Sequence, residues 1–287
     1  MNKNLSIAVH LHLYYLDMWP QIKQYLANLD DYDLFVTMNA ENRDIIEEIK
    51  KFHPATAFYV VENKGYDVGP FIFFLNRIDL NRYDLILKIH TKSNKNDCNT
   101  MLNGRYLNRK YWFRLLVEAL IGTKEIFRQN IKAFQKDAEM GMIGSKYCIM
   151  SGKKDTAAMK EKVTEVMSEL GFPEGEARTF VAGTMFMVRS ELLQKVKDKY
   201  GIDDFAATDN KVKDGTLAHA LERVFGYATE AQGYTIRGYD KNRAFEFYSM
   251  LLSLRRFVFQ KKITGRNYLQ IKIFKLPVYY RKITQED

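Results

Sequence analysis

The chain is poor in cysteine. Cys98 and Cys148 are the only two among 287 residues, and no C-x-x-C spacing occurs. Such a sequence does not support a disulfide framework or a structural zinc site, so we expect a reducing compartment. The sequence also contains no signal-peptide h-region, no internal repeat and no run of about 18 apolar residues. We therefore expect a cytoplasmic protein without a transmembrane helix.

Acidic residues are fewer than basic ones, which gives the chain a formal net charge of +9. A basic balance favours an anionic partner such as a nucleotide, a nucleic acid or an acidic membrane face, and charge alone does not choose among them. Hydrophobic residues make up 46% of the chain, which is enough for one large core or two modest ones.

The first half alternates between strand and helix patterns. Apolar alternation predicts strands over 5–15, 32–39 and 57–62, and helical spacing predicts helices that start near Asp17 and over 41–52. A helix over 71–78 follows. This order implies right-handed crossovers and a mostly parallel sheet, the α/β class.

A fourth strand over 85–89 ends abruptly in polar residues: His90, Thr91, Lys92, Ser93 and Asn94. In open α/β sheets, ligands bind outside the carboxyl ends of the strands. Two interpretations are open, namely a polar loop of the kind that follows any strand, and an anion site in which Lys92 is offered to a phosphate.

The segment before this strand, NKGYDVGP over 63–70, is a glycine-containing turn into a helix N-terminus, which suits an anion or nucleotide. The match to G-x-G-x-x-G is poor, so a dinucleotide site is not supported. Asp67 is either a helix cap or turn former, or a hydrogen-bond acceptor for a ribose, base or sugar hydroxyl. His10 and His12 lie on one face of the first strand, where core or pocket histidines are favoured over a metal pair.

The second half contains two compact motifs. A long helical stretch over 106–134 is broken near Gly122, and a strand over 141–147 and a helix over 157–170 follow. Polar residues over 97–105 predict a loop. In the first motif the small-residue corner 182–184 enters an apolar strand over 185–188, and Ser190 is expected to cap a helix.

In the second motif, DGTLAHALER over 214–223, Asp214 or Thr216 caps a helix on which His219 and Glu222 share a face. A carboxylate at a loop-to-helix junction is a natural general base.

The tail from Phe245 to Asp287 alternates basic residues with aromatic and aliphatic ones. Such segments suit an anionic membrane surface. A helical hairpin packed on the core is the alternative. RNA binding is less favoured because no RNA-binding motif accompanies the charge, so we expect no nucleic-acid partner.

Five segments in this order resemble the rhamnan synthesis F family: HLHLYYLDMWPQI, NKGYDVGPF, YDLILKIHTK, FVAGTMFMVR and DGTLAHALER. The resemblance covers most of residues 5–240. It implies a bacterial glycosyltransferase of cell-wall and surface polysaccharide assembly. It also implies a GT-A-like fold, with a Rossmann-like sheet flanked by helices, and a nucleotide-sugar donor, first of all dTDP-L-rhamnose.

One departure concerns metal. GT-A enzymes place a D-x-D metal motif after the fourth strand, but here His90, Thr91 and Lys92 stand there. The departure puts dependence on a divalent metal in doubt. A lysine offsets diphosphate charge as a point charge, without the Lewis acidity of Mg²⁺ or Mn²⁺.

The resemblance implies roles for particular residues. Asp214 matches the base that deprotonates the acceptor hydroxyl in inverting enzymes, while Lys92 and His90 would stabilise the departing diphosphate. The acceptor side would be lined by Gly183 and Thr184, with His219 and Glu222 nearby. The donor nucleotide is expected over the strand ends, at His12, Asn39, Asn63, Gly65, Asp67, His90, Thr91 and Lys92.

We expect a glycosyltransferase domain over 1–244, with a donor half over about 1–147 and an acceptor half over about 148–244. The segment 245–287 would be a basic helical tail that keeps the enzyme on the inner membrane face, beside a lipid-linked acceptor. Two rivals remain: a metal-dependent nucleotidyl- or phosphotransferase, and a non-catalytic module that binds polysaccharide or anionic lipid.

Overall fold

A computed structural model describes residues 4–92, 99–102, 104–173, 178–209, 214–264 and 268–282. The chain forms two compact units. The first comprises Met1–Lys95 and Phe113–Asp240, and the second comprises Asn96–Trp112 and Lys241–Asp287. The sequence-based division at residue 244 stays a prediction.

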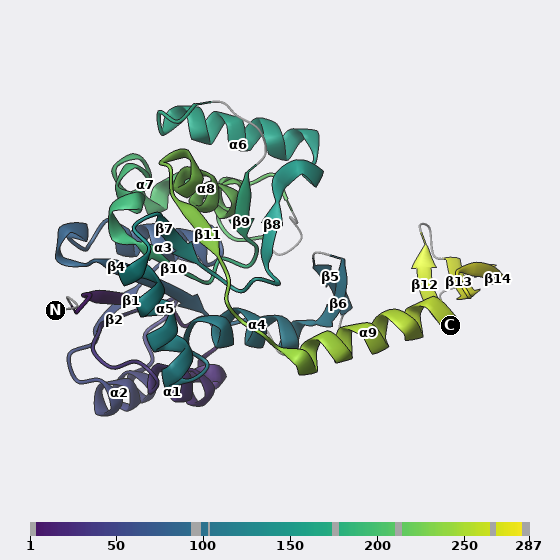
Figure 1. Cartoon of the computed structure of the whole chain (residues 1–287), viewed down its shortest axis with the longest axis horizontal. Helices are drawn as coiled ribbons and strands as arrows, with labels where there is room; N and C mark the ends of the chain where they lie inside the picture. Colours follow the sequence, from purple (N-terminus) through teal and green to yellow (C-terminus); the bar gives the residue numbers. More distant parts are fainter. Residues whose placement is uncertain are drawn as a thin grey trace. The chain divides into compact units, whose positions relative to one another are not determined.

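The first unit is built on a seven-stranded sheet with the order β11-β7-β10-β4-β1-β2-β3 (Figure 1). β4, β1, β2 and β3 are parallel, β7 and β11 are parallel, and β10 runs antiparallel to both of its neighbours. The predicted α/β class with a mostly parallel sheet is therefore confirmed. The strands are β1 (Ile7–His12), β2 (Asp33–Met38), β3 (Ala57–Val60), β4 (Leu85–His90), β7 (Met140–Ile143), β10 (Phe186–Arg189) and β11 (Thr235–Arg237), and a separate antiparallel pair joins β8 (Ile149–Ser151) to β9 (Thr179–Val181).

Helices flank this sheet on both faces. Those of the first unit are α1 (Trp19–Leu26), α2 (Arg43–Phe52), α3 (Val68–Leu75), α5 (Lys124–Lys136), α6 (Ala157–Glu169), α7 (Gln194–Lys199) and α8 (Leu217–Ala231), and α4 (Arg109–Ile121) begins in the second unit. The break between α4 and α5 falls where the sequence predicts it, and Thr123 caps α5 by accepting a hydrogen bond from the Ile126 amide at 3.2 Å.

The central strands β1 and β4 are buried along their whole length, as their apolar runs predict. Their register pairs His10 with Lys88 and His12 with His90, so these four polar side chains share one face of the sheet. α3 covers this face, because the ring of Phe74 stacks on His10 with the centroids 4.8 Å apart. A layer of buried polar groups therefore lies between the sheet and α3.

Two expected helix caps differ in the structure, and one of the two alternatives for a third is confirmed. Asp17 lies inside a short 3-10 helix, Leu16–Met18, and caps nothing. Ser190 lies inside another, Ser190–Leu193, and its hydroxyl donates instead to the Tyr83 carbonyl. Thr216 caps α8, which settles the choice between Asp214 and Thr216. The remaining 3-10 helices are Leu80–Arg82, Gly152–Lys154 and Ile202–Asp204.

The second unit contains a hairpin, a helix and a sheet. The expected loop over 97–105 is wrong where the structure describes it, because β5 (Asn99–Leu102) pairs with β6 (Arg105–Asn108), and Gly104 supplies the positive φ of 78° in the turn. Residues 93–98, which include Ser93, Asn94 and Cys98, lie outside the described part.

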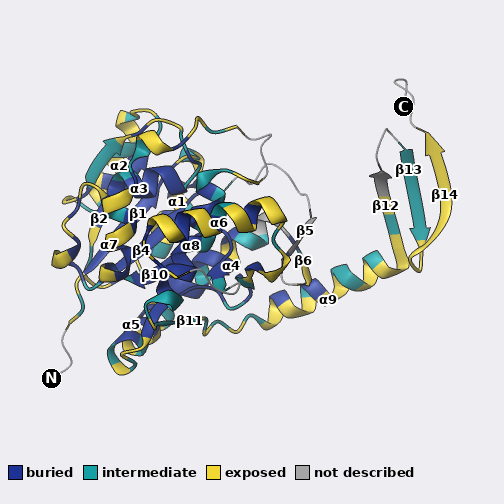
Figure 2. Ribbon diagram, turned by 90° about the horizontal axis from the view of Figure 1, so that it is seen from above, coloured by how far each residue is buried: buried dark blue, intermediate teal, exposed yellow. Residues whose placement is uncertain are grey.

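The tail is helical only in its first third. α9 (Arg243–Val258) leads into an antiparallel sheet of β12 (Phe259–Thr264), β13 (Tyr268–Ile273) and β14 (Leu276–Lys282). The sequence analysis missed this sheet, whose turn uses positive φ at Phe274 and Lys275 without a glycine. Figure 2 shows α9 and β14 largely exposed. None of the described helices is long and apolar enough to cross a membrane.

Candidate functional site

Lys88 is the centre of the candidate site. Its side chain is 0% exposed in the middle of β4. Its ammonium donates to Asp67 Oδ2 at 2.6 Å, to the Thr184 carbonyl at 2.9 Å and to Thr184 Oγ1 at 3.1 Å. Three oxygen acceptors thus match the three N–H donors of the ammonium, which is what allows a charge to remain in the interior.

Sequence analysis missed Lys88, because it counted this residue within an apolar strand. One signal in the sequence could have identified Lys88: it is the single charged residue within the apolar run of a strand expected to be buried on both faces. A charge in such a position must find a partner in the fold.

Asp67 supplies the opposite charge. Its Oδ2 accepts hydrogen bonds from Lys88 and from the Thr184 hydroxyl, and it lies 3.4 Å from His90 Nδ1. Asp67 stands at the N-cap position of α3 but makes no capping bond, so its interpretation as a helix cap is wrong. Burial alone would raise the pKa of Asp67, but His90, Lys88 and Lys92 outweigh it and hold the pKa well below its usual range. Asp67 is therefore ionised at neutral pH.

Three buried histidines surround this ion pair. The Thr37 hydroxyl lies 3.0 Å from His10 Nε2 and 3.0 Å from His12 Nδ1, so it can donate to one ring and accept from the other. Burial, the largest influence, lowers the pKa of His12 to about 4 and keeps the pKa values of His10 and His90 well below 6.5. All three rings are neutral at physiological pH.

His90 differs from the other two histidines. Its side chain is 3% exposed, yet neither ring nitrogen has a hydrogen-bond partner among the described residues. A buried imidazole without partners is costly unless something else supplies them. Burial is also the largest influence that lowers the pKa of Lys88, and Lys92, two residues after His90, lowers the pKa values of both groups further.

The described strand-end residues do not suit magnesium or manganese. The carboxylate beside His90 is that of Asp67, which is already paired with Lys88. In the described part of the chain, no three His, Cys, Asp or Glu residues lie together as metal ligands would. Magnesium and manganese prefer oxygen ligands, and the groups here are cationic ammonium and neutral imidazole.

The other predicted donor residues have mixed surroundings. The Thr91 hydroxyl accepts hydrogen bonds from the amides of Tyr14 and Tyr15 at 3.1 and 2.9 Å, so it holds the exit of β1 against β4. Asn39 donates to the Val61 carbonyl at 3.2 Å, and its buried Oδ1 has no partner among the described residues. The side chain of Asn63 is exposed.

The turn that carries Asp67 requires glycine. Gly65 has a φ of +66°, and a Cβ atom there would lie 2.4 Å from the ring of Phe205. The same turn is fixed further along, where the Tyr66 hydroxyl donates to the Asp209 carbonyl at 2.7 Å and the Tyr66 amide donates to Thr208 Oγ1 at 3.1 Å. The segment 205–209 therefore holds the turn in place.

The corner before β10 joins this cluster to α8. Gly183 and Thr184 both have positive φ, 90° and 50°. The Gly183 amide donates to Glu222 Oε1 at 2.7 Å, while Thr184 contacts Lys88 and Asp67. Because β10 is antiparallel to β4, the corner at its start reaches the edge where β4 ends.

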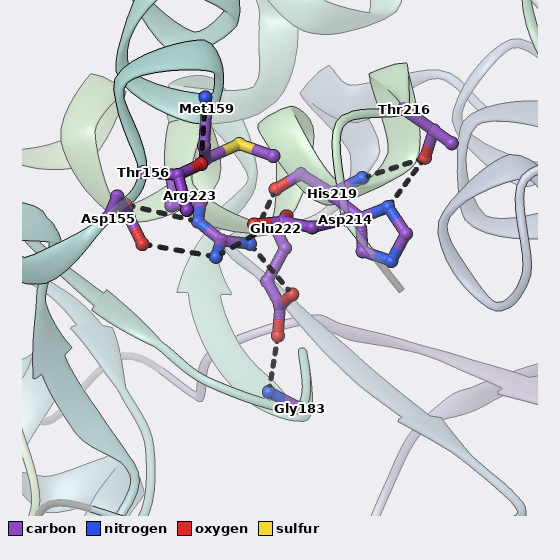
Figure 3. A network of polar contacts seen from close by, with 9 residues as sticks. All are labelled: Asp155, Thr156, Met159, Gly183, Asp214, Thr216, His219, Glu222 and Arg223. Atoms are coloured by element: carbon purple, nitrogen blue, oxygen red, sulfur yellow. Dashed lines mark hydrogen bonds and ion pairs between the residues drawn. The ribbon is translucent and has the colours of Figure 1, made fainter. Parts of the chain in front are cut away.

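Arg223 organises the residues around Asp214 (Figure 3). It contacts both oxygens of Asp155 at 3.2 Å and donates to Glu222 Oε2 at 3.3 Å and to the His219 carbonyl at 2.9 Å. Asp214 Oδ1 lies 3.8 Å from the same guanidinium, and its side chain is 39% exposed. Asp214 is thus held near a positive charge while more than a third of its side chain stays exposed.

His219 lies at the start of α8. Its Nδ1 is 2.7 Å from Thr216 Oγ1, and its ring lies 5.3 Å from that of Tyr66. The α8 residues therefore approach the turn after β3 as well as the corner before β10. The structure brings together Asp67, His90, Thr184 and Glu222 in one contact network, which Lys88 and Arg223 complete. Asn39 contacts Val61, and the Asn63 carbonyl accepts a hydrogen bond from the Thr208 amide at 2.9 Å.

These features define a mixed α/β protein with a buried polar cluster at the carboxyl ends of its parallel strands, which is the place where such sheets bind ligands. The sequence profile of the family described as Rhamnan synthesis protein F matches residues 1–234. The chain belongs to this family.

Known proteins with detectable similarity are distant. The chain is 25% identical over 238 residues to "Uncharacterized protein WxcX" of Xanthomonas campestris pv. campestris, an alignment that covers 80% of this chain and 32% of the relative. The chain thus spans about a third of the length of the curated relatives it matches.

Solved structures give only weak similarity. TarS 1-349 of S. aureus in complex with UDP aligns with a TM-score of 0.38 and 11% identity, over 71% of this chain and 52% of that one. 4-diphosphocytidyl-2C-methyl-D-erythritol synthase of Anaerococcus prevotii aligns with a TM-score of 0.38 and 11% identity, over 87% and 96%.

Proposed function

We propose that the chain is a glycosyltransferase of polysaccharide assembly, which moves a sugar from a nucleotide-sugar donor to an acceptor hydroxyl. Family membership supports the class of reaction. The observation that carries the proposal is the contact path from Asp214 through Arg223 and Glu222 to the Gly183–Thr184 corner and then to Asp67. This path ties a solvent-facing carboxylate to the strand-end cluster.

The donor side of the proposed site is the edge formed by the ends of β1 to β4. The nucleotide would lie over His12, Asn39, Asn63, Gly65 and Asp67, and its diphosphate beside His90, Thr91 and Lys92. Negative charge grows on the diphosphate as the sugar leaves, and a nearby cation stabilises it. Lys92 is suited to this role because Asp67 is already neutralised by Lys88.

Asp214 is the proposed base. It takes the proton from the acceptor hydroxyl, whose oxygen forms a bond to the anomeric carbon while the nucleoside diphosphate leaves with the electron pair. Attack in line with the leaving group inverts the anomeric centre. Arg223 is occupied by Asp155, which leaves Asp214, 3.8 Å from the guanidinium, as a partly exposed carboxylate that an acceptor hydroxyl can reach. Holding the two substrates in register supplies much of the rate.

The finer assignment follows the family. The first donor to test is dTDP-L-rhamnose, and the acceptor would be a lipid-linked bacterial surface polysaccharide. A GT-A type is supported by the single sheet that runs from the donor side through β10 to β7 and β11. The basic tail would hold the enzyme on the inner membrane face, where a lipid-linked acceptor lies.

The test is release of nucleoside diphosphate from a panel of nucleotide sugars by the wild type and Asp214→Asn. We expect the variant to lose about 10²- to 10⁴-fold in turnover, since it lacks the base. Asp203→Asn is the matched control, because Asp203 is exposed on the same unit and pairs with Lys64 at 3.3 Å. Unchanged turnover in Asp214→Asn would remove Asp214 from the mechanism.

Two further measurements separate the rivals. Activity that persists in a chelator counts against a metal-dependent nucleotidyl- or phosphotransferase. A chain that is thermally stabilised by nucleotide sugars or polysaccharide, yet turns over none of the donors, is a binding module and not an enzyme.

A further inference from the structure

The second unit exposes most of the large apolar side chains that the structure finds at the surface. Leu276 is 68% exposed, and the first unit contributes only Tyr14, Val60 and Tyr239 to the described set. The members in the second unit come from α9, from the start of β12 and from β13, β14 and their turn: Phe247, Met250, Leu251, Leu254, Phe257, Val258, Phe259, Ile273, Phe274, Leu276, Val278, Tyr279 and Tyr280. We call them the apolar surface. Exposed apolar groups gathered in this way mark an interaction site.

The charge around this surface has one sign. Residues 247–285 contain no Asp or Glu, and their basic residues are Arg255, Arg256, Lys261, Lys262, Arg266, Lys272, Lys275, Arg281 and Lys282. The +9 of the whole chain is thus concentrated in its last segment. An anionic partner is the electrostatic complement of such a segment.

A groove of about 650 Å³ opens within the second unit, lined by residues of α9, β12, β13, the β13–β14 turn and the β5–β6 hairpin. Arg256, Lys272 and Lys275 supply its cations, and Met250, Leu254 and Phe257 supply apolar walls. The groove therefore combines cationic side chains that suit an anion with an apolar lining.

Arg256 places a buried hydrogen-bond donor in the groove. Its guanidinium lies 4.4 Å from the centroid of the Tyr106 ring, and its buried Nε has no hydrogen-bond partner among the described residues. A buried guanidinium donor without an acceptor is costly, and phosphate oxygens are the acceptors that guanidinium groups match best.

We propose that the second unit docks on an anionic phospholipid bilayer, with a lipid phosphate in the groove at Arg256, Lys272 and Lys275. α9 has 16 residues and is not apolar enough to span a membrane, so it lies along the interface with its apolar side chains in the acyl boundary. The surrounding cations are attracted to the anionic head groups.

A bilayer fits these observations better than a nucleic acid or a protein segment. Single-stranded nucleic acids are bound by aromatic and arginine stacking platforms. The apolar surface also carries aliphatic side chains, among them Leu251, Leu254, Leu276 and Val278, which offer no stacking face but insert readily into lipid. They lie on both a helix and a sheet, which suits a broad fluid partner rather than a single peptide.

The experiment is sedimentation of the full chain with vesicles of neutral phosphatidylcholine, and with vesicles in which about a third of the lipid is phosphatidylglycerol. We expect at least tenfold tighter binding to the anionic vesicles, weakened by salt. The assay contains no nucleotide sugar, so this inference does not rest on glycosyl transfer. Lipid binding and the proposed glycosyl transfer can therefore fail independently of each other.

Two matched double variants locate the binding. Arg256→Gln with Lys272→Gln should weaken binding to anionic vesicles at least tenfold, whereas Lys50→Gln with Lys51→Gln, which removes the same charge from α2, should leave it within twofold. Leu254→Ser with Leu276→Ser should also lower binding, and its circular dichroism should match that of the wild type because both side chains are exposed. This variant keeps the proposal testable if the groove variant fails to fold.

Four outcomes would overturn the proposal: no binding to either vesicle, equal binding to both, equal loss in the two charge variants, or displacement of the chain from vesicles by a single-stranded oligonucleotide at equal phosphate concentration. A dimer in solution that is broken by Leu254→Ser with Leu276→Ser would instead assign the apolar surface to a second copy of the chain.

Discussion

Replacing Lys88 with Met tests the central cluster most directly. The change keeps the length of the side chain but leaves the carboxylate of Asp67 buried without its cation. Removing one partner of a buried ion pair costs about 3–5 kcal/mol. We expect about 3 kcal/mol, the lower end, because Asp67 is 22% exposed and keeps the Thr184 hydroxyl.

The loss should depend on pH. In the wild type the pKa of Asp67 is held low, so its contribution to stability is present at neutral pH and lost only as the pH falls through that low value. Without Lys88, burial is expected to bring the pKa of Asp67 above its ordinary value of about 3.9. The deficit of Lys88→Met should therefore be largest near neutral pH and shrink as Asp67 becomes protonated.

Urea unfolding followed by tryptophan fluorescence measures the effect. Trp19 is 1% exposed in the first unit, and a Trp112→Phe background makes it the only indole. The measurement is made at about pH 7.5 and about pH 5 for the wild type, Lys88→Met and the double variant Asp67→Asn with Lys88→Met. The double variant should recover much of the loss, because no uncompensated charge remains.

The control is Lys162→Met. Lys162 pairs with Glu165 at 2.7 Å, but the pair is exposed on α6, so the change should cost less than about 1 kcal/mol. The reasoning fails if Lys88→Met stays within about 1 kcal/mol of the wild type, if its deficit is the same at both pH values, or if removing Asp67 as well brings no recovery.

Two further predictions concern turns and positioning. Gly65→Ala should lower the free energy of unfolding by about 2 kcal/mol or more, because it combines a positive φ with a clash against Phe205. Gly233→Ala, where φ is +87° and the space is open, should lower it by about 1 kcal/mol. Equal losses in unfolding experiments would contradict the clash. Asp155→Ala removes the bidentate partner of Arg223 and should cost about 3 kcal/mol, and it should lower turnover of a nucleotide sugar more than it raises KM. An unchanged turnover would mean that the Asp155–Arg223 pair does not position the proposed base.

Sequence patterns predicted the sheet well where each strand carries its own periodicity. The runs at β1, β2 and β4 were found because an apolar segment bounded by polar residues needs no information from elsewhere in the chain. The predicted break between α4 and α5 is confirmed for the same reason, since Thr123 caps α5 through a contact three residues away.

Contacts between distant residues could not be predicted in this way. Lys88 looks like an interruption in an apolar strand until Thr184 and Asp67 are placed around it, and Asp67 looks like a helix cap until Lys88 is seen beside it. The sheet of the second unit was missed because its turn uses Phe274 and Lys275 at positive φ, positions where sequence rules expect glycine or asparagine.

The antiparallel direction of β10 has a consequence for how the chain folds. The contact between Lys88 and the Thr184 carbonyl joins residues 96 positions apart, and the one between Asp67 and Thr184 spans 117. During synthesis, β1 to β4 leave the ribosome long before their neighbour β10 exists, so a lysine destined for the interior spends that interval at an open sheet edge. Its ammonium then lacks the Thr184 oxygens, and we expect a lysine charge at an open edge to disfavour pairing with another chain. Pairing of β10 closes this edge, and the 183–184 corner before β10 brings the Thr184 oxygens to the ammonium, so we expect the two halves of the sheet to be completed together.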